Sequence, residues 1–408
     1  MSAVATPSSL LRCIARSRPL WSTSYRAAAA RPFSFCAPRQ FKKPGSLPQR
    51  TPDFAFAFDI DGVLLRSSTP IPGASDALRY LQDQRIPFIL LTNGGGITER
   101  ERVDVLQDRL HVPLGLENFV QSHTPFAGMD EYKDKTVLVV GGDGRKCANV
   151  AKSYGFKNVV TPSDLLSACP ELWPFSQNFL DYHRSSAEEM PKDALRDLKI
   201  DAVFVYNDPR DWGLDAQIIT DVLLSKNGIL GTISPKNGNP ELPNRGYQQD
   251  GQPPLYFSNP DLIWAAKYHL PRLGQGAFRE ALEGVWAAIT GGRSKGVELK
   301  KTVIGKPYEL TYKFAENKLT QYRKLTSGGD TAALEPLKTV YMVGDNPESD
   351  IRGANDYKSP AGTDWHSILV RTGVYQDGTE PSQKPRVIVD NVMEAVRYAV
   401  ERSGKGQV

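Results

Sequence analysis

Two aspartates, Asp59 and Asp61, follow directly after an apolar segment and lie next to Gly62. The segment, residues 54–58, is too short for a helix and predicts a buried strand of a parallel sheet. Ligands of open α/β sheets bind at the carboxyl ends of such strands. The two carboxylates would repel each other there, and a divalent cation, or a proton held by one of them, would relieve the repulsion. Because the same residues also suit a turn that closes a strand, the pair decides little by itself.

Three further apolar segments, residues 87–91, 303–305 and 340–344, are predicted to be strands that end in polar residues. These polar residues are Thr92, Asn93, Gly94, Lys306, Asp345 and Asp350. Because the carboxyl ends of parallel strands lie at one edge of a sheet, these residues and the two aspartates should converge on one concave site. That site would contain a nucleophile, a hydroxyl, a cation and a metal-binding carboxylate.

The segments that must position these residues alternate between strand and helix. This alternation predicts an α/β fold with a parallel sheet and right-handed crossovers. Helices are predicted at residues 74–84, 98–110, 145–154, 214–224, 277–290, 309–325 and 392–401. Further strands are predicted at residues 136–140, 158–160, 200–206, 368–371 and 386–388. Thr98 and Glu101 have the spacing of a capping box at a helix start. Two segments rich in turn-forming and polar residues, 169–197 and 234–254, are predicted to be surface loops.

As a set, the four strand ends resemble the motifs of the haloacid dehalogenase-like hydrolases, a superfamily consisting mostly of phosphatases. The resemblance extends over about residues 54–398 and implies a Rossmann-like three-layer core with a parallel sheet. The α/β segment between Thr92 and Lys306 resembles the smaller C2-type cap domain of one subfamily. The implied boundaries are 53–124 and 259–408 for the catalytic core and 125–258 for the cap. Residues 206–213, 344–355 and 365–375 also resemble the cat-eye-syndrome-critical-region-protein-five-like group, whose members are often mitochondrial.

The resemblance also implies a role for each catalytic residue. Asp59 would be the nucleophile that forms an aspartyl-phosphate, and Asp61 would act first as general acid and then as general base. The hydroxyl of Thr92, with the amides of Asn93 and Gly94, would bind the phosphoryl group. Lys306 would neutralise the charge that develops on the phosphoryl group and would orient the nucleophile.

An Mg²⁺ ion is implied as the cofactor, since the expected ligands are all oxygens. Asp345 and Asp59 would bind it through their carboxylates, and Asp61 through its backbone carbonyl. Asp350 would be either a further ligand or a residue that supports the ligands from behind.

The distribution of charge excludes a general nucleic-acid surface. The 408 residues have a formal net charge of +4, but residues 1–52 contain seven Arg, two Lys and no acidic residue. The remainder has 41 basic and 46 acidic residues, so we expect no binding of nucleic acid. No apolar run approaches the roughly 18 residues that a transmembrane helix needs.

The first 50 residues, rich in Arg, Ser and Ala, are typical of a disordered mitochondrial presequence. Residues 31–34 resemble a site for cleavage after Phe33, and the matrix is the expected compartment. The alternative is a basic tail without a targeting role.

Other kinds of chemistry have little support in the sequence. The five histidines are scattered, no C-x-x-C motif occurs, and a dinucleotide motif at Gly141 to Gly144 fails because position 147 is Cys. We therefore expect a phosphatase whose partner is a small phosphorylated metabolite that enters through a restricted opening under the cap. The resemblance also points to glycerophospholipid metabolism and to a homodimer formed through the cap. The alternative function is a mitochondrial binding or scaffold protein that keeps the fold but has little activity.

Overall fold

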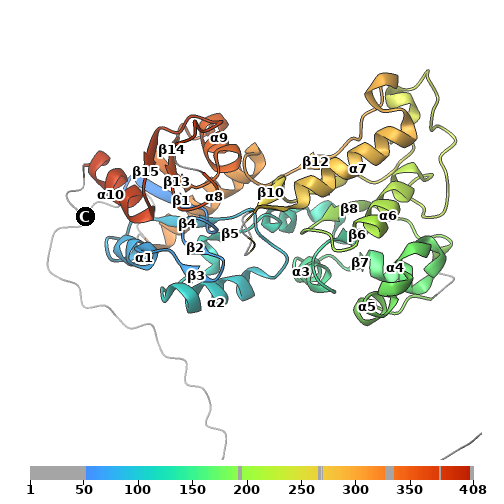
Figure 1. The fold of residues 1–408 in the computed structure, drawn as a ribbon, viewed down its shortest axis with the longest axis horizontal. Coiled ribbons are helices and arrows are strands. Elements are labelled where there is room, and N and C mark those ends of the chain that lie inside the picture. The colour runs from blue at the N-terminus through green and yellow to red at the C-terminus, as the bar shows by residue number, and fades with distance from the viewer. Residues whose placement is uncertain are drawn as a thin grey trace, which may run out of the picture. The chain divides into compact units, whose positions relative to one another are not determined.

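The computed structural model describes residues 52–191, 195–264, 268, 270–326, 335–375 and 378–404. The predicted presequence lies outside the described residues. Two parallel sheets organise the described part of the chain, and both belong to one compact unit, Arg50–Val408 (Figure 1). The predicted α/β class with a parallel sheet is therefore confirmed.

The first sheet has the strand order β15-β14-β13-β1-β4-β5, and all its neighbouring strands are parallel. Its strands are β1 (Phe54–Phe58), β4 (Phe88–Leu91), β5 (Phe119–Val120), β13 (Thr339–Gly344), β14 (Asp364–Val370) and β15 (Val387–Val389). The helices that follow or precede these strands are α1 (Ala74–Asp83), α2 (Glu99–Leu110), α8 (Glu309–Thr326), α9 (Arg352–Asp356) and α10 (Val392–Arg402). We call this part the core.

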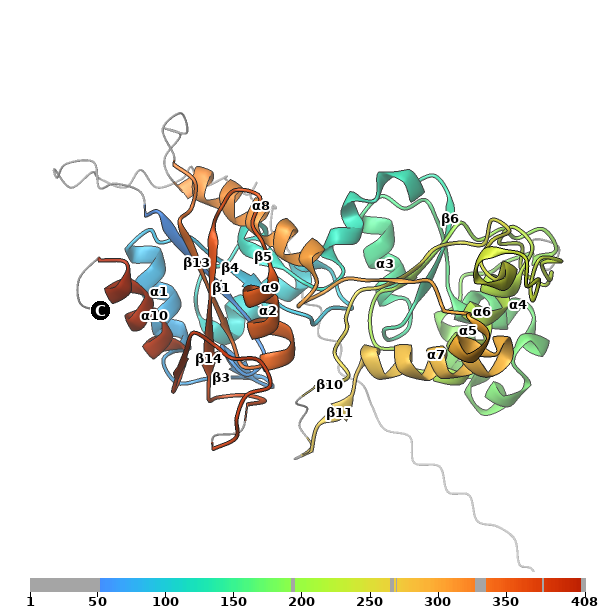
Figure 2. The same cartoon turned by 90° about the horizontal axis from the view of Figure 1, so that it is seen from above.

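Strand β1 lies inside the core sheet because both its faces are apolar. Its Phe side chains point to one face and pack against α1, α2 and α10, whereas its Ala side chains point to the other face, toward α8 and α9. The small Ala side chains leave room for the helices on that face, where Tyr312 of α8 is fully buried. Figure 2 shows α1 and α10 on one side of the sheet and α8 and α9 on the other. The predicted three-layer core is thus present.

The second sheet, which we call the cap sheet, has the order β12-β9-β8-β6-β7 and is also parallel. Its strands are β6 (Thr136–Val140), β7 (Asn158–Val160), β8 (Ala202–Val205), β9 (Leu255–Phe257) and β12 (Thr302–Val303). Its helices are α3 (Lys146–Ser153), α4 (Pro162–Ala168), α5 (Leu180–Ser186), α6 (Trp212–Leu224) and α7 (Gln275–Thr290). Alternate residues of β6 and β8 face α3 on one side and α4, α6 and α7 on the other.

One sequence-based boundary is wrong. The core was expected to resume at residue 259, but α7 packs in the apolar cluster of the cap through Phe278, Leu282 and Trp286 (Figure 1). Strand β12 then pairs with β9 of the cap sheet, so the chain packs into an apolar cluster of the core again only from α8 onward. The helix has an apolar stripe that either sheet could bury, and the sequence pattern does not show which sheet receives it.

Two short hairpins complete the architecture. Strands β2 (Leu65–Arg66) and β3 (Thr69–Pro70) form one just after the first strand, and β10 (Ile263–Trp264) and β11 (Arg272–Leu273) form the other before α7. The segment 169–197, predicted to be a loop, instead contains α5 and the 3-10 turns Pro170–Leu172 and Pro174–Phe179. Among the described residues, no helix has both the length and the apolar character needed to cross a membrane.

Candidate active site

The carboxyl ends of β1, β4 and β13 carry three of the predicted site residues. Asp59 follows β1, Thr92 follows β4 and Asp345 follows β13, and these strands are adjacent in the core sheet. Lys306 arrives differently from the prediction, because it follows β12 of the cap sheet. Its ammonium group nevertheless reaches Asp59, with Nζ 2.6 Å from Oδ1. All four of these residues line one pocket, as the motif spacing predicted.

Lys306 is held between two buried carboxylates. Its Nζ lies 2.6 Å from Asp59 Oδ1 and 2.7 Å from Asp350 Oδ1, and the three side chains are at most 10% exposed. Burial alone would lower the pKa of Lys306, but the charges of Asp350 and Asp59 outweigh it and raise that pKa. Because a buried ammonium remains charged beside two carboxylates, Lys306 provides a permanent positive charge next to Asp59.

Three carboxylates gather at this point, each offering an oxygen within 4.8 Å of the others: Asp59, Asp345 and Asp350. Burial raises the pKa of Asp345 well above its ordinary value, and the charges of Asp59 and Asp350 raise it further. Both oxygens of Asp350 are engaged, since Oδ1 forms an ion pair with Lys306 and Oδ2 accepts a hydrogen bond from the Asn346 amide at 3.1 Å. One ammonium does not balance three carboxylates, so this set of oxygens suits a divalent cation.

The backbone of two neighbouring segments, at Gly62 and at Gly373–Val374, packs closely against the Asp345 carboxylate and holds it in place. Its Oδ2 accepts a hydrogen bond from the Val374 amide at 2.6 Å. A Cβ on Gly373 would lie 1.9 Å from the same oxygen, and a Cβ on Gly62, which has φ +92°, would lie 2.4 Å from it. Only glycine fits at both positions. Gly373 was not identified from the sequence, because nothing local in the segment after β14 marks it.

Asp61 differs from its neighbours in being open to the pocket. Its side chain is 50% exposed, and its Oδ2 lies 3.8 Å from a guanidinium nitrogen of Arg102 on α2. Desolvation by the walls of the pocket raises the pKa of Asp61, while Arg102 and Lys306 oppose that rise. Its carboxylate also lies beside the Thr92–Gly94 loop, because a Cβ on Gly94 would be 3.9 Å from Asp61 Oδ2. An accessible carboxyl with a raised pKa can carry a proton to or from a substrate.

The polar side chains of the loop after β4 lie at the pocket and have hydrogen-bond partners within the protein. The Thr92 hydroxyl is at the site and is 4% exposed at the residue level, but it accepts a hydrogen bond from the Gly94 amide at 3.0 Å. Asn93 instead forms a clamp on the lysine backbone. Its Oδ1 accepts from the Lys306 amide at 2.7 Å, and its Nδ2 donates to the Lys306 carbonyl at 2.9 Å. The role of this side chain was missed, because it depends on a partner 213 residues away.

The pocket above the carboxylates has a volume of about 770 Å³. Its walls include Asn207 to Arg210 and Trp212 after β8, together with the β10–β11 hairpin. Three arginines, Arg102, Arg210 and Arg272, and the acids Asp208 and Asp261 also line it. The cap therefore contributes to the site, and its wall is both aromatic and cationic.

A buried polar chain joins core and cap near the pocket. His123 is fully buried; its Nε2 accepts from the Gly96 amide at 3.1 Å and its Nδ1 lies 2.9 Å from the Tyr154 hydroxyl. The Tyr154 hydroxyl in turn donates to Glu99 at the start of α2. Since Nε2 must be an acceptor, the neutral ring with a proton on Nδ1 is the form that fits. Burial accordingly lowers the pKa of His123 to about 4.

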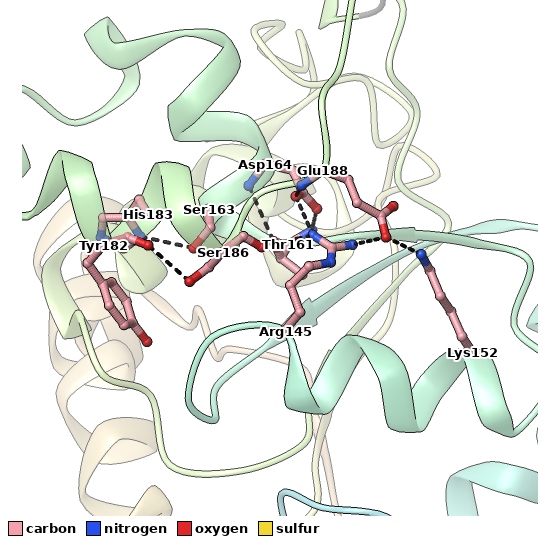
Figure 3. A network of polar contacts seen from close by, with 9 residues as sticks. All are labelled: Arg145, Lys152, Thr161, Ser163, Asp164, Tyr182, His183, Ser186 and Glu188. Carbon is pink, nitrogen blue, oxygen red and sulfur yellow. Dashed lines mark hydrogen bonds and ion pairs between the residues drawn. The ribbon is translucent and has the colours of Figure 1, made fainter. Parts of the chain in front are cut away.

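The cap has a second polar network, built around Arg145 (Figure 3). Arg145 contacts Asp164 at 2.5 Å and Glu188 at 3.0 Å, and Glu188 also pairs with Lys152. His183 is hydrogen-bonded to Ser163 at 2.9 Å. Because these contacts join α3, α4, α5 and the segment that follows α5, the network holds the cap helices together.

Comparison with known proteins gives the same family as the sequence motifs. The family model described as haloacid dehalogenase-like hydrolase matches residues 56–157, and the HAD-hydrolase-like model matches residues 303–395. A mitochondrial hydrolase of Saccharomyces cerevisiae is 40% identical over 367 residues, which are 85% of this chain and 96% of that protein. A Schizosaccharomyces pombe protein, named a cardiolipin synthase (CMP-forming) / mitochondrial hydrolase fusion protein, is 42% identical over 392 residues. The match covers 94% of this chain but only 59% of that fusion protein.

Solved structures with a similar fold include a p-nitrophenyl phosphatase from Archaeoglobus fulgidus and a hypothetical protein from Pyrococcus horikoshii. Both have a TM-score of 0.53, with 16% and 19% sequence identity respectively. Each match covers 85% of this chain and 99% of the other chain. At such identities the likeness concerns the fold alone.

Proposed function

Because this chain belongs to the haloacid dehalogenase-like hydrolases, we propose that it is an Mg²⁺-dependent phosphatase of a small phosphomonoester. The observation that carries this proposal is the contact of Lys306 with both Asp59 and Asp350, beneath a pocket into which Asp61 opens. A nucleophile, a fixed positive charge and an accessible proton carrier are the groups that phosphoryl transfer requires.

In the first step, an oxygen of Asp59 attacks the phosphorus of the substrate. The bond from phosphorus to the leaving oxygen breaks, and Asp61 gives its proton to that oxygen. Burial raises the pKa of Asp59, and the charge of Lys306 opposes that rise and so favours the ionised nucleophile. Lys306 also offsets the charge on the phosphoryl oxygens. The product of this step is an aspartyl-phosphate on Asp59.

In the second step, water attacks the phosphorus of the aspartyl-phosphate. Asp61, now ionised, takes the proton of that water, and the bond between phosphorus and the Asp59 oxygen breaks to release phosphate. The half-exposed position of Asp61 supports this double role, since the group must meet both the leaving oxygen and a water.

The proposed Mg²⁺ ligands are the carboxylates of Asp59 and Asp345 and the backbone carbonyl of Asp61. When bound, the ion would neutralise charge on the phosphoryl oxygens. Asp350 pairs with the Lys306 ammonium through Oδ1 and accepts from the Asn346 amide through Oδ2, so we assign it to holding Lys306 rather than to the metal. Asn93 positions Lys306 through two hydrogen bonds to its backbone. Thr92 and the amides of the same loop are proposed to bind the phosphoryl group, with Thr92 exchanging its Gly94 donor for the substrate.

The substrate is proposed to be a small phosphomonoester linked to glycerophospholipid metabolism, in mitochondria. The cap walls the pocket and so disfavours a phosphoprotein. The S. cerevisiae relative is named a mitochondrial hydrolase, and the S. pombe relative is named as a fusion that includes a cardiolipin synthase. Those names support the compartment and the link to phospholipid chemistry.

Hydrolysis of p-nitrophenyl phosphate by the purified full chain tests the proposal. Activity should need Mg²⁺, should be lost with a chelator, and should return when Mg²⁺ is added back. Asp59→Asn should abolish turnover while the circular dichroism spectrum stays unchanged. Activity that survives in Asp59→Asn would rule out the aspartyl-phosphate route, and no turnover of this or any other phosphomonoester would favour a binding role.

A further inference from the structure

The β10–β11 hairpin concentrates exposed apolar side chains at the mouth of the pocket. Fifteen large hydrophobic side chains are exposed in the described part of the chain, and six of them lie between residues 262 and 273. They are Leu262, Ile263, Trp264, Tyr268, Leu270 and Leu273, which are 41–63% exposed. Such a concentration on a short segment is unusual for a surface that faces only water.

Both faces of this hairpin carry apolar groups. Directly paired residues of an antiparallel hairpin point to the same face, and the pairs here are Ile263 with Leu273 and Trp264 with Arg272. One face therefore presents two aliphatic side chains, and the other presents an indole beside a guanidinium. The guanidinium of Arg272 lies 4.7 Å from the ring centre of Tyr268. Aromatic rings mixed with cations are typical of segments that sit in the headgroup region of a bilayer.

The base of the hairpin is fastened to the active site. Asp261 accepts a hydrogen bond from Asn93 at 3.1 Å, and Asn93 holds the backbone of Lys306. At the other end, the Gly274 amide donates to the Leu262 carbonyl at 2.9 Å. Whatever the hairpin contacts is therefore brought to the mouth of the pocket.

The position of the hairpin restricts what can cover it. Four of its residues, Ile263, Trp264, Arg272 and Leu273, line the pocket, so a protein partner or a second copy seated there would obstruct the substrate's entrance. A phospholipid bilayer obstructs nothing, because it presents apolar chains and the phosphate groups of its lipids together. Arg102, Arg210 and Arg272 would attract an anionic headgroup toward the carboxylates.

We infer that the β10–β11 hairpin docks on a phospholipid bilayer and that the site acts on a phosphomonoester headgroup of a membrane lipid. The inference rests on the proposed phosphatase function and narrows its substrate class. A water-soluble phosphomonoester of the same headgroup chemistry would react more slowly, since the hairpin would contribute nothing to its binding.

The test uses vesicles of phosphatidylcholine that contain a minority of phosphatidic acid, the simplest lipid with a phosphomonoester. The full chain is compared with Leu262→Ser/Leu270→Ser, two hairpin residues that do not line the pocket. The matched control is Phe175→Ser/Ile233→Ser, which removes apolar groups that are 77% and 79% exposed elsewhere in the cap. Binding is measured by vesicle flotation in high salt, which weakens any attraction of the basic residues 1–52 to the vesicles.

We expect the leucine variant to bind vesicles about 10-fold to 100-fold more weakly, because two half-inserted leucines are lost. The control variant should bind like the unaltered chain. Release of phosphate from phosphatidic acid should fall in parallel with binding, whereas hydrolysis of p-nitrophenyl phosphate should be unchanged. The unchanged soluble activity would also show that the leucine variant is folded.

Three results would overturn the inference: no binding of the unaltered chain to vesicles, equal binding by both variants, or faster turnover of glycerol 3-phosphate than of phosphatidic acid. If analytical sedimentation shows the unaltered chain to be a dimer and the leucine variant a monomer, the hairpin binds a second copy of the chain and the inference is also overturned. Failure of the proposed function looks different. In that case the chain hydrolyses neither p-nitrophenyl phosphate nor phosphatidic acid, whether or not it binds the vesicles.

Discussion

Replacing Lys306 by methionine should destabilise the fold as well as stop the reaction. The ammonium lies 2.6 Å from Asp59 and 2.7 Å from Asp350, and these side chains are almost completely buried. Methionine keeps most of the volume of the lysine stem but leaves two buried carboxylates without their counter-charge. Breaking a buried pair in this way costs about 3–5 kcal/mol of unfolding free energy.

A double-mutant cycle separates the ion pair from other effects of the substitution. Asp350→Asn is combined with Lys306→Met, since Asp350 is fully buried and contacts the ammonium directly. If the pair is formed as described, the loss in the double variant should be smaller than the sum of the single losses. The coupling energy should be about 1–3 kcal/mol.

Urea unfolding, followed by circular dichroism with a chelator present, measures the free energies. Urea is preferred to guanidinium chloride, because the latter is a salt and would screen the charges under study. In parallel, kcat for p-nitrophenyl phosphate with Mg²⁺ should fall by about 10²–10³-fold in Lys306→Met, the usual effect of removing one group that stabilises developing charge. A coupling energy below roughly 0.5 kcal/mol would refute the arrangement, because contacting charges must couple.

Three further predictions concern the supports of the site. Asn93→Ala should lower kcat more than it changes KM and should cost roughly 2–5 kcal/mol of stability, because two buried backbone groups of Lys306 lose their partner. Gly373→Ala should weaken Mg²⁺ activation, because the new Cβ would lie 1.9 Å from the Asp345 carboxylate and displace it. Gly284→Ala, at an exposed position of α7 with open space around it, should instead stabilise the fold by about 0.5–1 kcal/mol. Equal Mg²⁺ titrations for the two variants would contradict this. Burial lowers the pKa of His123 from 6.5 to about 4, so as the pH falls the unfolded chain takes up this proton before the folded chain does. The unfolding free energy should therefore fall by roughly 3 kcal/mol as the pH drops from 6.5 to 4. The difference between the urea midpoints of the unaltered chain and of His123→Gln, measured against pH, should show this fall, because the raised pKa values of Asp61 and Asp345 affect both chains alike.

Much of the core was predictable because its signals are local. The run 54–58 alternates Phe and Ala, which is enough for a strand buried on both faces, and it becomes β1. Thr98 and Glu101 form the predicted capping box at the start of α2. Asp59, Thr92 and Asp345 follow apolar strands directly, so the sequence alone was enough to place them at a common edge of a parallel sheet.

The wrong or missing parts depend on contacts between distant segments. The helix α7 was assigned to the core because its own stripe does not identify the sheet that buries it. Asn93 was assigned through its backbone amide, and its side chain was overlooked because its partners are Lys306 and Asp261. The importance of Gly373 is visible only once the Asp345 carboxylate lies against it.

By itself, then, the sequence determined which residue types stand at the ends of which strands, since strand, turn and cap preferences act within a few neighbouring residues. The tertiary structure alone decided that Lys306 enters from the cap sheet and is held between Asp59 and Asp350. It also decided that an apolar hairpin stands at the mouth of the pocket. The physical reason is that strand pairing and burial depend on faces that meet only after the chain has folded, as across the 247 residues between Asp59 and Lys306.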